Sequence, residues 1–304
     1  MRQNVPSNKA AAKKLHRITR GNPEMRIVPY CTLVEKISEL IQSTTRILPS
    51  DVLDAIICMR ARETSLLAAS ILDQIIENAG IASKENLPLC QDTGIAVFFV
   101  DIGDEARVEN PGLDAAIQEG TRKGYREGIL RMSIVRDPLR RVNTGDNSPA
   151  IVHIRMVPGD GLTVMFCPKG GGCENMSRLV MLSPGDGRKG VVDFVVETVL
   201  SGGGRPCPPV IVGVGLGSDF EGSAILSKRA LLRKVGERNA DTFYASLEQE
   251  LLEKINSLGI GPMGLGGIST ALDVFIETAP CHIASMPLAI NIQCHSARHG
   301  IIEL

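Results

Sequence analysis

From about Val34 onward, the hydrophobic positions alternate between helical spacing and short apolar runs. Apolar residues recur every three or four positions in several stretches, which predicts helices over 33–47, 50–61, 64–79, 114–130, 190–200, 221–234 and 241–258. Runs rich in Val, Ile and Phe predict strands over 95–101, 151–157, 162–166, 210–214, 272–278 and 288–292. This order predicts an α/β fold, with a mixed sheet flanked by helices and an N-terminal helical segment.

The N-terminal 30 residues differ from the remainder in charge. They carry seven basic side chains and one acid, although the whole chain has a net charge of −1. Such a segment is typical of a targeting peptide, a nucleic-acid-binding arm, a solvated extension, or sequence upstream of a start at Met25. We favour the last two. We therefore expect residues 1–30 to form a basic, disordered extension and residues 31–304 to form one folded domain.

The composition argues against several classes of function. With 33 Lys and Arg against 34 Asp and Glu, the chain has no overall attraction for nucleic acid. Seven Phe, three Tyr and no Trp make a base-stacking platform improbable. No apolar run approaches the roughly 18–20 residues of a membrane-spanning helix, and no secretory signal is evident. We expect a cytoplasmic protein that binds neither nucleic acid nor membranes.

The cysteines fall into different sequence environments. None forms a Cys-x-x-Cys pair, so no local zinc or ferredoxin spacing is present. Cys31 and Cys58 lie in or near apolar helical patterns, where a small buried side chain is expected. Cys90, Cys207 and Cys294 lie in loops beside predicted strands, where α/β proteins build their sites. They are either three unrelated buried thiols or the ligands of an iron–sulfur cluster whose remaining iron acts as a Lewis acid.

An ordered set of motifs surrounds these cysteines. It comprises Leu87-Pro-Leu-Cys-Gln-Asp-Thr-Gly94, Leu130-Arg-Met-Ser133, Asn143-Thr-Gly-Asp-Asn147, Lys169-Gly-Gly-Gly172, Cys207-Pro-Pro209, Gly259-Ile-Gly-Pro262 and Cys294-His-Ser-Ala-Arg298. In this order the motifs resemble the class I fumarase and L-tartrate dehydratase family of iron–sulfur hydro-lyases, over about residues 30–300. The chain resembles the alpha subunit of the two-subunit form, and the resemblance favours fumarase over L-tartrate dehydratase.

The resemblance implies roles for the residues around the first cysteine. Cys90, Cys207 and Cys294 would carry a 4Fe–4S cluster. Gln91 would contact the substrate, and Asp92 occupies the position of a family acid near the leaving hydroxyl.

Further roles are implied elsewhere in the chain. Arg131 would pair with a substrate carboxylate through its planar fork of donors. Gly171 and Gly172 would offer backbone N–H groups to an anion, and Lys169 either adds charge there or is solvated. His282 matches a histidine that reaches the active site from a neighbouring protomer.

Cys173 and Arg298 lie in or beside these motifs. Cys173 stands where the family often has Ser, and we interpret it as a conservative replacement, because a fourth thiolate would close the reactive iron. Arg298 is a candidate to stabilise the negative charge of the cluster.

The sequence runs ten residues past Cys294, whereas fused family members continue into a domain that supplies further arginines and the base. We therefore expect half of an active site. A beta subunit would complete it, within a heterotetramer that contains an alpha–alpha dimer.

The function expected from the resemblance is reversible hydration of fumarate to malate, a small dicarboxylate. L-tartrate and mesaconate-type substrates are alternatives. A different alternative is a nucleotide-binding protein, because Val210-Ile-Val-Gly-Val-Gly-Leu-Gly217 follows a strand and precedes a helix. It lacks the G-x-G-x-x-G spacing, and close packing of a strand on a helix accounts for its glycines more simply. An iron–sulfur sensor or a non-catalytic subunit is the remaining alternative.

Overall fold

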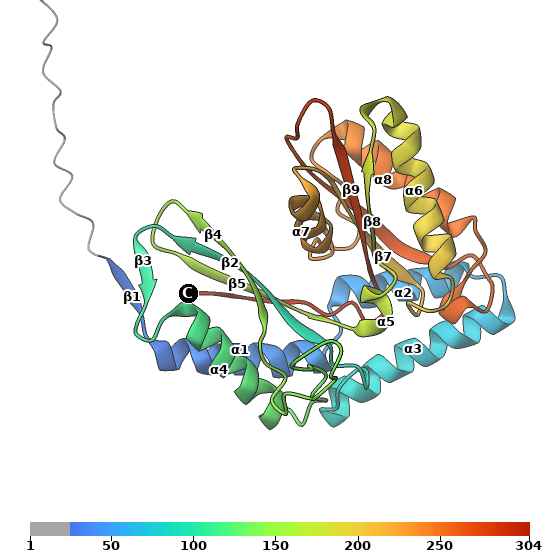
Figure 1. The fold of residues 1–304 in the computed structure, drawn as a ribbon. Helices are drawn as coiled ribbons and strands as arrows, with labels where there is room; N and C mark the ends of the chain where they lie inside the picture. The colour runs from blue at the N-terminus through green and yellow to red at the C-terminus, as the bar shows by residue number, and fades with distance from the viewer. Residues whose placement is uncertain (1–24) are drawn as a thin grey trace, which may run out of the picture.

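The computed structural model describes residues 25–304, which form two lobes (Figure 1). Each lobe contains a four-stranded mixed sheet, so the predicted α/β class with a mixed sheet flanked by helices is confirmed, and the protein has two such sheets where the pattern predicts one. Residues 1–24 of the expected basic extension lie outside the described residues. The fold starts earlier than the pattern predicts, because β1 (Arg26–Val28) pairs in parallel with β3 (Ala106–Val108).

The first lobe is a sheet covered on one face by two helices. Its strands follow the order β10 (Gly300–Glu303), β5 (Leu162–Lys169), β2 (Ile95–Gly103) and β4 (Ile151–Val157), with only the β2–β4 pair parallel. Helices α1 (Tyr30–Arg46) and α4 (Leu113–Glu127) pack on this sheet. A Cβ added at Gly120 of α4 would lie 2.7 Å from the Ile37 side chain, so this glycine permits the close approach of the two helices.

The second lobe has helices on both faces of its sheet. The strand order is β6 (Arg178–Leu182), β9 (Met286–Gln293), β7 (Val210–Gly217) and β8 (Ala271–Ala279). One hydrophobic cluster joins the sheet to α6 (Gly187–Gly202) and α8 (Thr242–Asn256). Another joins it to α2 (Ser50–Arg62), α3 (Leu66–Glu85) and α7 (Phe220–Ala230). Shorter turns of helix occur at Gly171–Glu174 (α5), Pro184–Asp186 and Pro262–Gly264.

The glycines of β7 serve packing. A Cβ at Gly213 would lie 2.1 Å from the Ser227 carbonyl oxygen, and one at Gly215 would lie 2.0 Å from that of Ser223. Both carbonyls belong to α7, so only glycine lets this helix lie so close to the strand. These glycines are inside a strand and not in a phosphate-binding loop, which removes the main argument for a nucleotide site.

The structure corrects the predicted end of the 64–79 helix. Helix α3 continues through Gly80 to Glu85, because a single glycine costs only about 1 kcal/mol in a helix and Ala79 and Ala82 on either side of it are buried. The helix ends instead at Asn86, in the left-handed conformation with φ 56°.

Among the helices of residues 25–304, none combines the length and apolarity needed to cross a bilayer.

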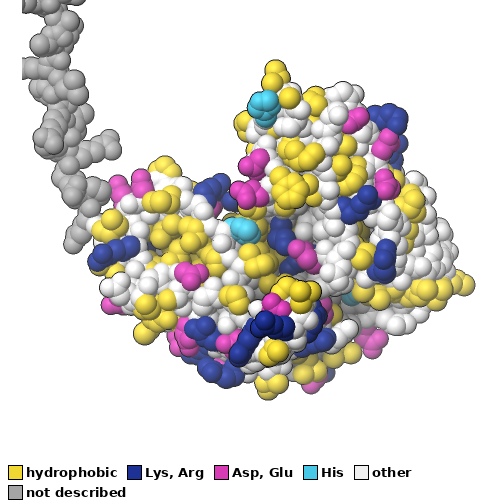
Figure 2. Space-filling view, in the orientation of Figure 1, with side chains coloured by type: hydrophobic (Ala, Val, Ile, Leu, Met, Phe, Trp, Pro, Cys, Tyr) yellow, Lys and Arg dark blue, Asp and Glu magenta, His cyan; other side chains and the backbone are white. Residues whose placement is uncertain are grey.

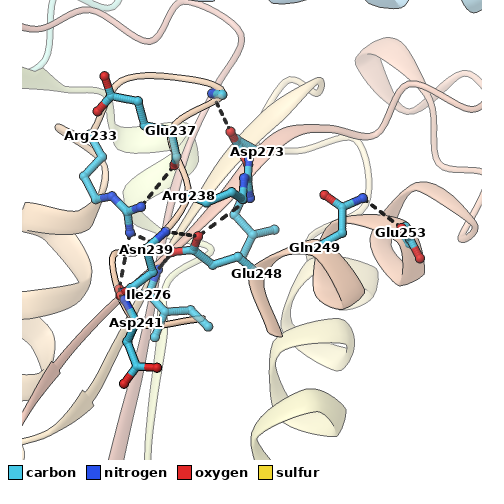
Figure 3. A network of polar contacts seen from close by, with 12 residues as sticks. Arg233, Glu237, Arg238, Asn239, Asp241, Glu248, Gln249, Glu253, Asp273 and Ile276 are labelled. Atoms are coloured by element: carbon cyan, nitrogen blue, oxygen red, sulfur yellow. Dashed lines mark hydrogen bonds and ion pairs between the residues drawn. The ribbon is translucent and has the colours of Figure 1, made fainter. Parts of the chain in front are cut away.

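A buried polar network fastens the segment after α7 to the second sheet (Figure 3). Glu248 of α8 accepts hydrogen bonds from Arg233 at 2.6 Å and from the N–H of Ile276 at 2.9 Å. Asp273 of β8 pairs with Arg238 and accepts a hydrogen bond from the N–H of Gly236 at 2.8 Å. Both acids are fully buried, and each is paired with arginine, as buried charges must be.

Candidate functional site

The loops that carry Cys90, Cys207 and Cys294 meet where the two lobes join. Cys207 lies before β7 and Cys294 follows β9; these strands are antiparallel neighbours, so the two cysteines lie at the same sheet end. The N–H of His295 donates to the Cys207 carbonyl at 3.3 Å. Cys90 lies between α3 and β2, in the connection to the first lobe. Cys207 also has φ 55°, a backbone conformation that costs energy and is found at functional sites.

The three thiols are half-buried and lie within electrostatic reach of one another or of Cys173. Burial raises the pKa of Cys207, and the nearby Cys90 and Cys173 raise it further. Among residues 25–304, no three Cys, His or acidic side chains are spaced to share one metal ion. Thiolates that bind different irons of a cluster are spaced more widely than the ligands of one ion. Thiol-only donors on three bendable loops therefore suit a cluster.

Asp92 links the first cysteine loop to the glycine motif. Its Oδ1 accepts a hydrogen bond from the N–H of Gly94 at 3.0 Å, and its Oδ2 accepts one from the N–H of Gly171 at 2.8 Å. The N–H of Asp92 itself donates to the Cys90 sulfur at 3.4 Å. The Gly171 donor is thus used within the protein, which leaves Gly172 as the other glycine of the predicted pair.

Two of the predicted substrate-binding residues lie in segments that contact the Asp92 loop, Gly171 through its N–H and Arg131 through its carbonyl. Thr93 donates its hydroxyl to the Arg131 carbonyl at 3.0 Å, so the two motifs are in contact. Gln91 and Arg131 are exposed, as are Gly171 and Gly172 at the start of α5. An exposed arginine and exposed glycines in segments that both contact the Asp92 loop suit an anionic ligand arriving from solvent.

His282 is not brought to the site of its own chain. It lies in the exposed loop that precedes β9, whereas Cys294 follows the other end of that strand. Eight extended residues span about 26 Å, which is far beyond the reach of a side chain. The His282 Nδ1 accepts a hydrogen bond from the N–H of Ala284 at 3.1 Å.

The environments of the other cysteines differ from expectation. Cys31 and Cys58 are exposed, because each lies on the solvent side of its helix, so the prediction of burial was wrong. Cys173, in contrast, is buried beside a predicted ligand. The neighbouring Cys294 thiol and the ammonium of Lys169, 3.4 Å from the Cys173 sulfur, lower the pKa of Cys173. Sequence spacing gave no signal for this contact, because it joins α5 to the end of β9.

Lys169 is buried and not solvated. Its Nζ donates to the Ile292 carbonyl at 2.6 Å and pairs with Glu174 at 3.1 Å. Glu174 also pairs with Lys228 of α7 at 2.5 Å. Burial alone would raise the pKa of Glu174, but the two lysines lower it to about 2. These pairs tie the glycine motif to both β9 and α7.

The surface between the lobes has mixed charge. Figure 2 shows a face hollowed between the lobes, with basic and acidic side chains in the hollow. Arg229 of α7 and Asp101 of β2 form an ion pair of 3.4 Å between the lobes. On this face basic and acidic side chains are interspersed.

Comparison with known proteins agrees with the motifs. Residues 34–303 match the family described as fumarate hydratase (Fumerase). The chain is 46% identical over 269 residues to a putative L(+)-tartrate dehydratase subunit alpha of Methanocaldococcus jannaschii, covering 86% of this chain and 94% of that one. It is 33% identical over 277 residues to the L(+)-tartrate dehydratase subunit alpha of Escherichia coli K12, covering 88% and 91%. The chain therefore belongs to the class I fumarase and L-tartrate dehydratase family of hydro-lyase alpha subunits.

Proposed function

We propose that this chain is the cluster-bearing subunit of a hydro-lyase that adds water to, or removes it from, a small dicarboxylate. The observation that carries the proposal is the meeting of Cys90, Cys207 and Cys294 beside Asp92, from loops far apart in the sequence. A 4Fe–4S cluster bound there, with one iron free of protein ligands, supplies a Lewis acid for C–O cleavage.

Different residues of the chain then bind the substrate and transfer a proton. Arg131 and the N–H of Gly172 bind the substrate carboxylates, while Gln91 orients the substrate beside them. Asp92, fixed by two backbone N–H groups, exchanges a proton with the leaving hydroxyl at its carboxylate. The base that removes the carbon-bound proton comes from a beta subunit.

Two substrates have specific support. Leu130-Arg-Met-Ser133 and Lys169-Gly-Gly-Gly-Cys-Glu-Asn-Met-Ser177 resemble fumarase segments and favour the fumarate and malate pair. The names of the relatives favour L-tartrate. Both are 2-hydroxy dicarboxylates, or yield one on hydration, so the same residues serve either.

The assembly follows from the names of the relatives and from His282. Relatives called alpha subunits support a beta partner. The separation of His282 from Cys294 within one chain supports an alpha–alpha dimer in which His282 serves the site of the other protomer.

One preparation tests the proposal. The chain is purified without oxygen, reconstituted with iron and sulfide, mixed with the beta subunit, and assayed with malate and with L-tartrate. Cys207→Ser should abolish stable cluster incorporation, whereas Cys173→Ser should not, since Cys173 is the matched cysteine that we do not assign as a ligand. Equal losses would refute the ligand assignment. A protein that takes up no iron would refute the proposal. A cluster-loaded complex without hydro-lyase activity would favour the alternative of an iron–sulfur sensor.

A further inference from the structure

Arg298 is among the largest fully buried side chains of the protein, with 2% of its surface exposed. Its Nε donates to the Ser296 carbonyl at 3.3 Å, and its Nη2 donates to the Asp92 carbonyl at 3.0 Å. Its Nη1 is also buried, and no hydrogen-bond partner for it exists among residues 25–304. A guanidinium cannot lose its proton in a protein, so this donor carries charge into the interior.

Among the described residues, the other buried cation is Lys169, and it has a carboxylate beside it, as does the half-buried Arg238. Lys169 pairs with Glu174, and Arg238 pairs with Asp273 (Figure 3). Within the described part of the chain, no Asp or Glu lies within 4.0 Å of a nitrogen of Arg298. Because an unpaired buried charge is strongly unfavourable, the position of Arg298 calls for an anion from outside the polypeptide.

The neighbours of Arg298 indicate where that anion lies. The residue is four positions after Cys294, in the segment that follows β9. Its bond to the Asp92 carbonyl reaches the loop of Cys90. One guanidinium therefore holds together the loops of two of the three predicted ligands and places its charge between them.

We propose that Arg298 is the positioning residue and counter-charge of the iron–sulfur cluster, an inference that rests on the proposed function. A cluster held by three thiolates has net negative charge, which supplies the missing partner. Arg298 is buried under the loops and Arg131 is exposed, so the two arginines serve different anions: Arg298 the cluster and Arg131 the substrate.

The test compares Arg298→Gln, Arg298→Lys and Arg238→Gln in the full chain after anaerobic reconstitution. Three quantities are measured without substrate. They are the iron and sulfide content per chain, the midpoint potential of the cluster, and the difference in Tm between loaded and cluster-free protein. Loss of the positive charge destabilises the reduced cluster. Arg298→Gln should therefore lower the ratio of reduced to oxidised cluster at a fixed potential about tenfold, which is about 59 mV for one electron.

Each outcome decides a separate point. Arg298→Lys keeps the charge and should keep a potential near that of the wild type, although it loses a carbonyl bond and should lose iron faster. Arg238→Gln removes a half-buried arginine that already has carboxylate partners, so it should lower both Tm values equally and leave the potential unchanged.

A lysine variant with the lowered potential, or a glutamine variant with the wild-type potential and Tm difference, would overturn the inference. If Arg298→Gln does not fold, the potential of Arg298→Lys decides. A wild-type chain that binds no cluster would instead refute the proposed function itself.

Discussion

Asp92 and Gly171 are 79 positions apart, yet the Asp92 Oδ2 accepts a hydrogen bond of 2.8 Å from the Gly171 N–H. The contact joins the loop of the first cysteine to the glycine motif of α5. It fixes the carboxylate, since Oδ1 is held at the same time by the N–H of Gly94. It also brings the candidate acid against the candidate anion-binding turn, so that both would face one substrate.

Replacement of Asp92 by asparagine should separate its chemistry from its structural role. The amide oxygen of Asp92→Asn can still accept one of the two N–H bonds, so iron content and Tm should change little. A group that transfers a proton is worth about 10²- to 10⁴-fold in rate, and kcat of the assembled enzyme should fall by that order. Asp92→Ala, which frees both N–H groups, should lose stability as well. Near wild-type turnover in the asparagine variant would contradict the catalytic assignment.

Gly94 is predicted to be one of the least replaceable glycines. It has φ 74°, and a Cβ there would lie 2.7–2.8 Å from backbone atoms of Lys169. Gly145 also has positive φ, 84°, but an added Cβ would meet nothing within 4 Å. Gly145→Ala should therefore cost only the conformational penalty of about 1 kcal/mol, and Gly94→Ala should cost at least about 2 kcal/mol more. Urea unfolding of both variants measures the difference, and equal costs would show that the strand shifts freely.

The meeting of the Cys207 and Cys294 loops could be predicted from the sequence because both cysteines lie at strand ends. Cys207 and Cys294 flank runs of Val and Ile that could only be buried strands, and antiparallel neighbours necessarily bring such ends together. The positions of the helices and most strands followed in the same way from local periodicity.

Contacts made between elements could not be predicted. Lys169 is a charged residue in a glycine-rich motif, and its burial depends on Glu174 and on a carbonyl of β9. Cys31 and Cys58 follow apolar spacing but face solvent. Apolar spacing identifies the side of a helix that is buried, but it does not show that every apolar residue near that side is buried. Strands β1 and β10 are too short to carry a pattern, and they form only because a partner strand is present.

Glu174 should make stability depend on acid pH. Its pKa is lowered to about 2 by Lys169 and Lys228, whereas an unfolded glutamate titrates near 4.5. A lowered carboxyl pKa contributes stability that is fully present above the unfolded value and is lost as pH falls toward about 2. The carboxylate is partly open to solvent, so we expect it to contribute about 1–2 kcal/mol to the free energy of unfolding at pH 7.

Urea unfolding of Glu174→Gln measures this contribution. The variant should be less stable than the wild type at pH 7, and the two should converge between pH about 4.5 and about 2. Glu77→Gln, on the exposed face of α3, is the control and should track the wild type throughout. A difference between Glu174→Gln and the wild type that is constant over this range would indicate lost packing and not lost charge.

His282 should act across protomers. It lies about 26 Å along β9 from Cys294, so a site that uses both must draw them from different chains. We expect His282→Ala and Cys207→Ser each to be inactive alone with the beta subunit. When the two variants are co-expressed with different tags, half of the dimers are hybrids. Each hybrid has one intact site, which should restore about a quarter of wild-type activity.

The matched control for this experiment pairs two defects on the same half of the site. Cys207→Ser and Asp92→Asn both damage the cluster side of whichever site they enter. Their hybrids contain no site with wild-type Cys207 and Asp92 from one chain, so co-expression should restore nothing. If the His282 pair also fails to recover activity although hybrid dimers are isolated by their two tags, His282 does not serve the site of the neighbouring protomer.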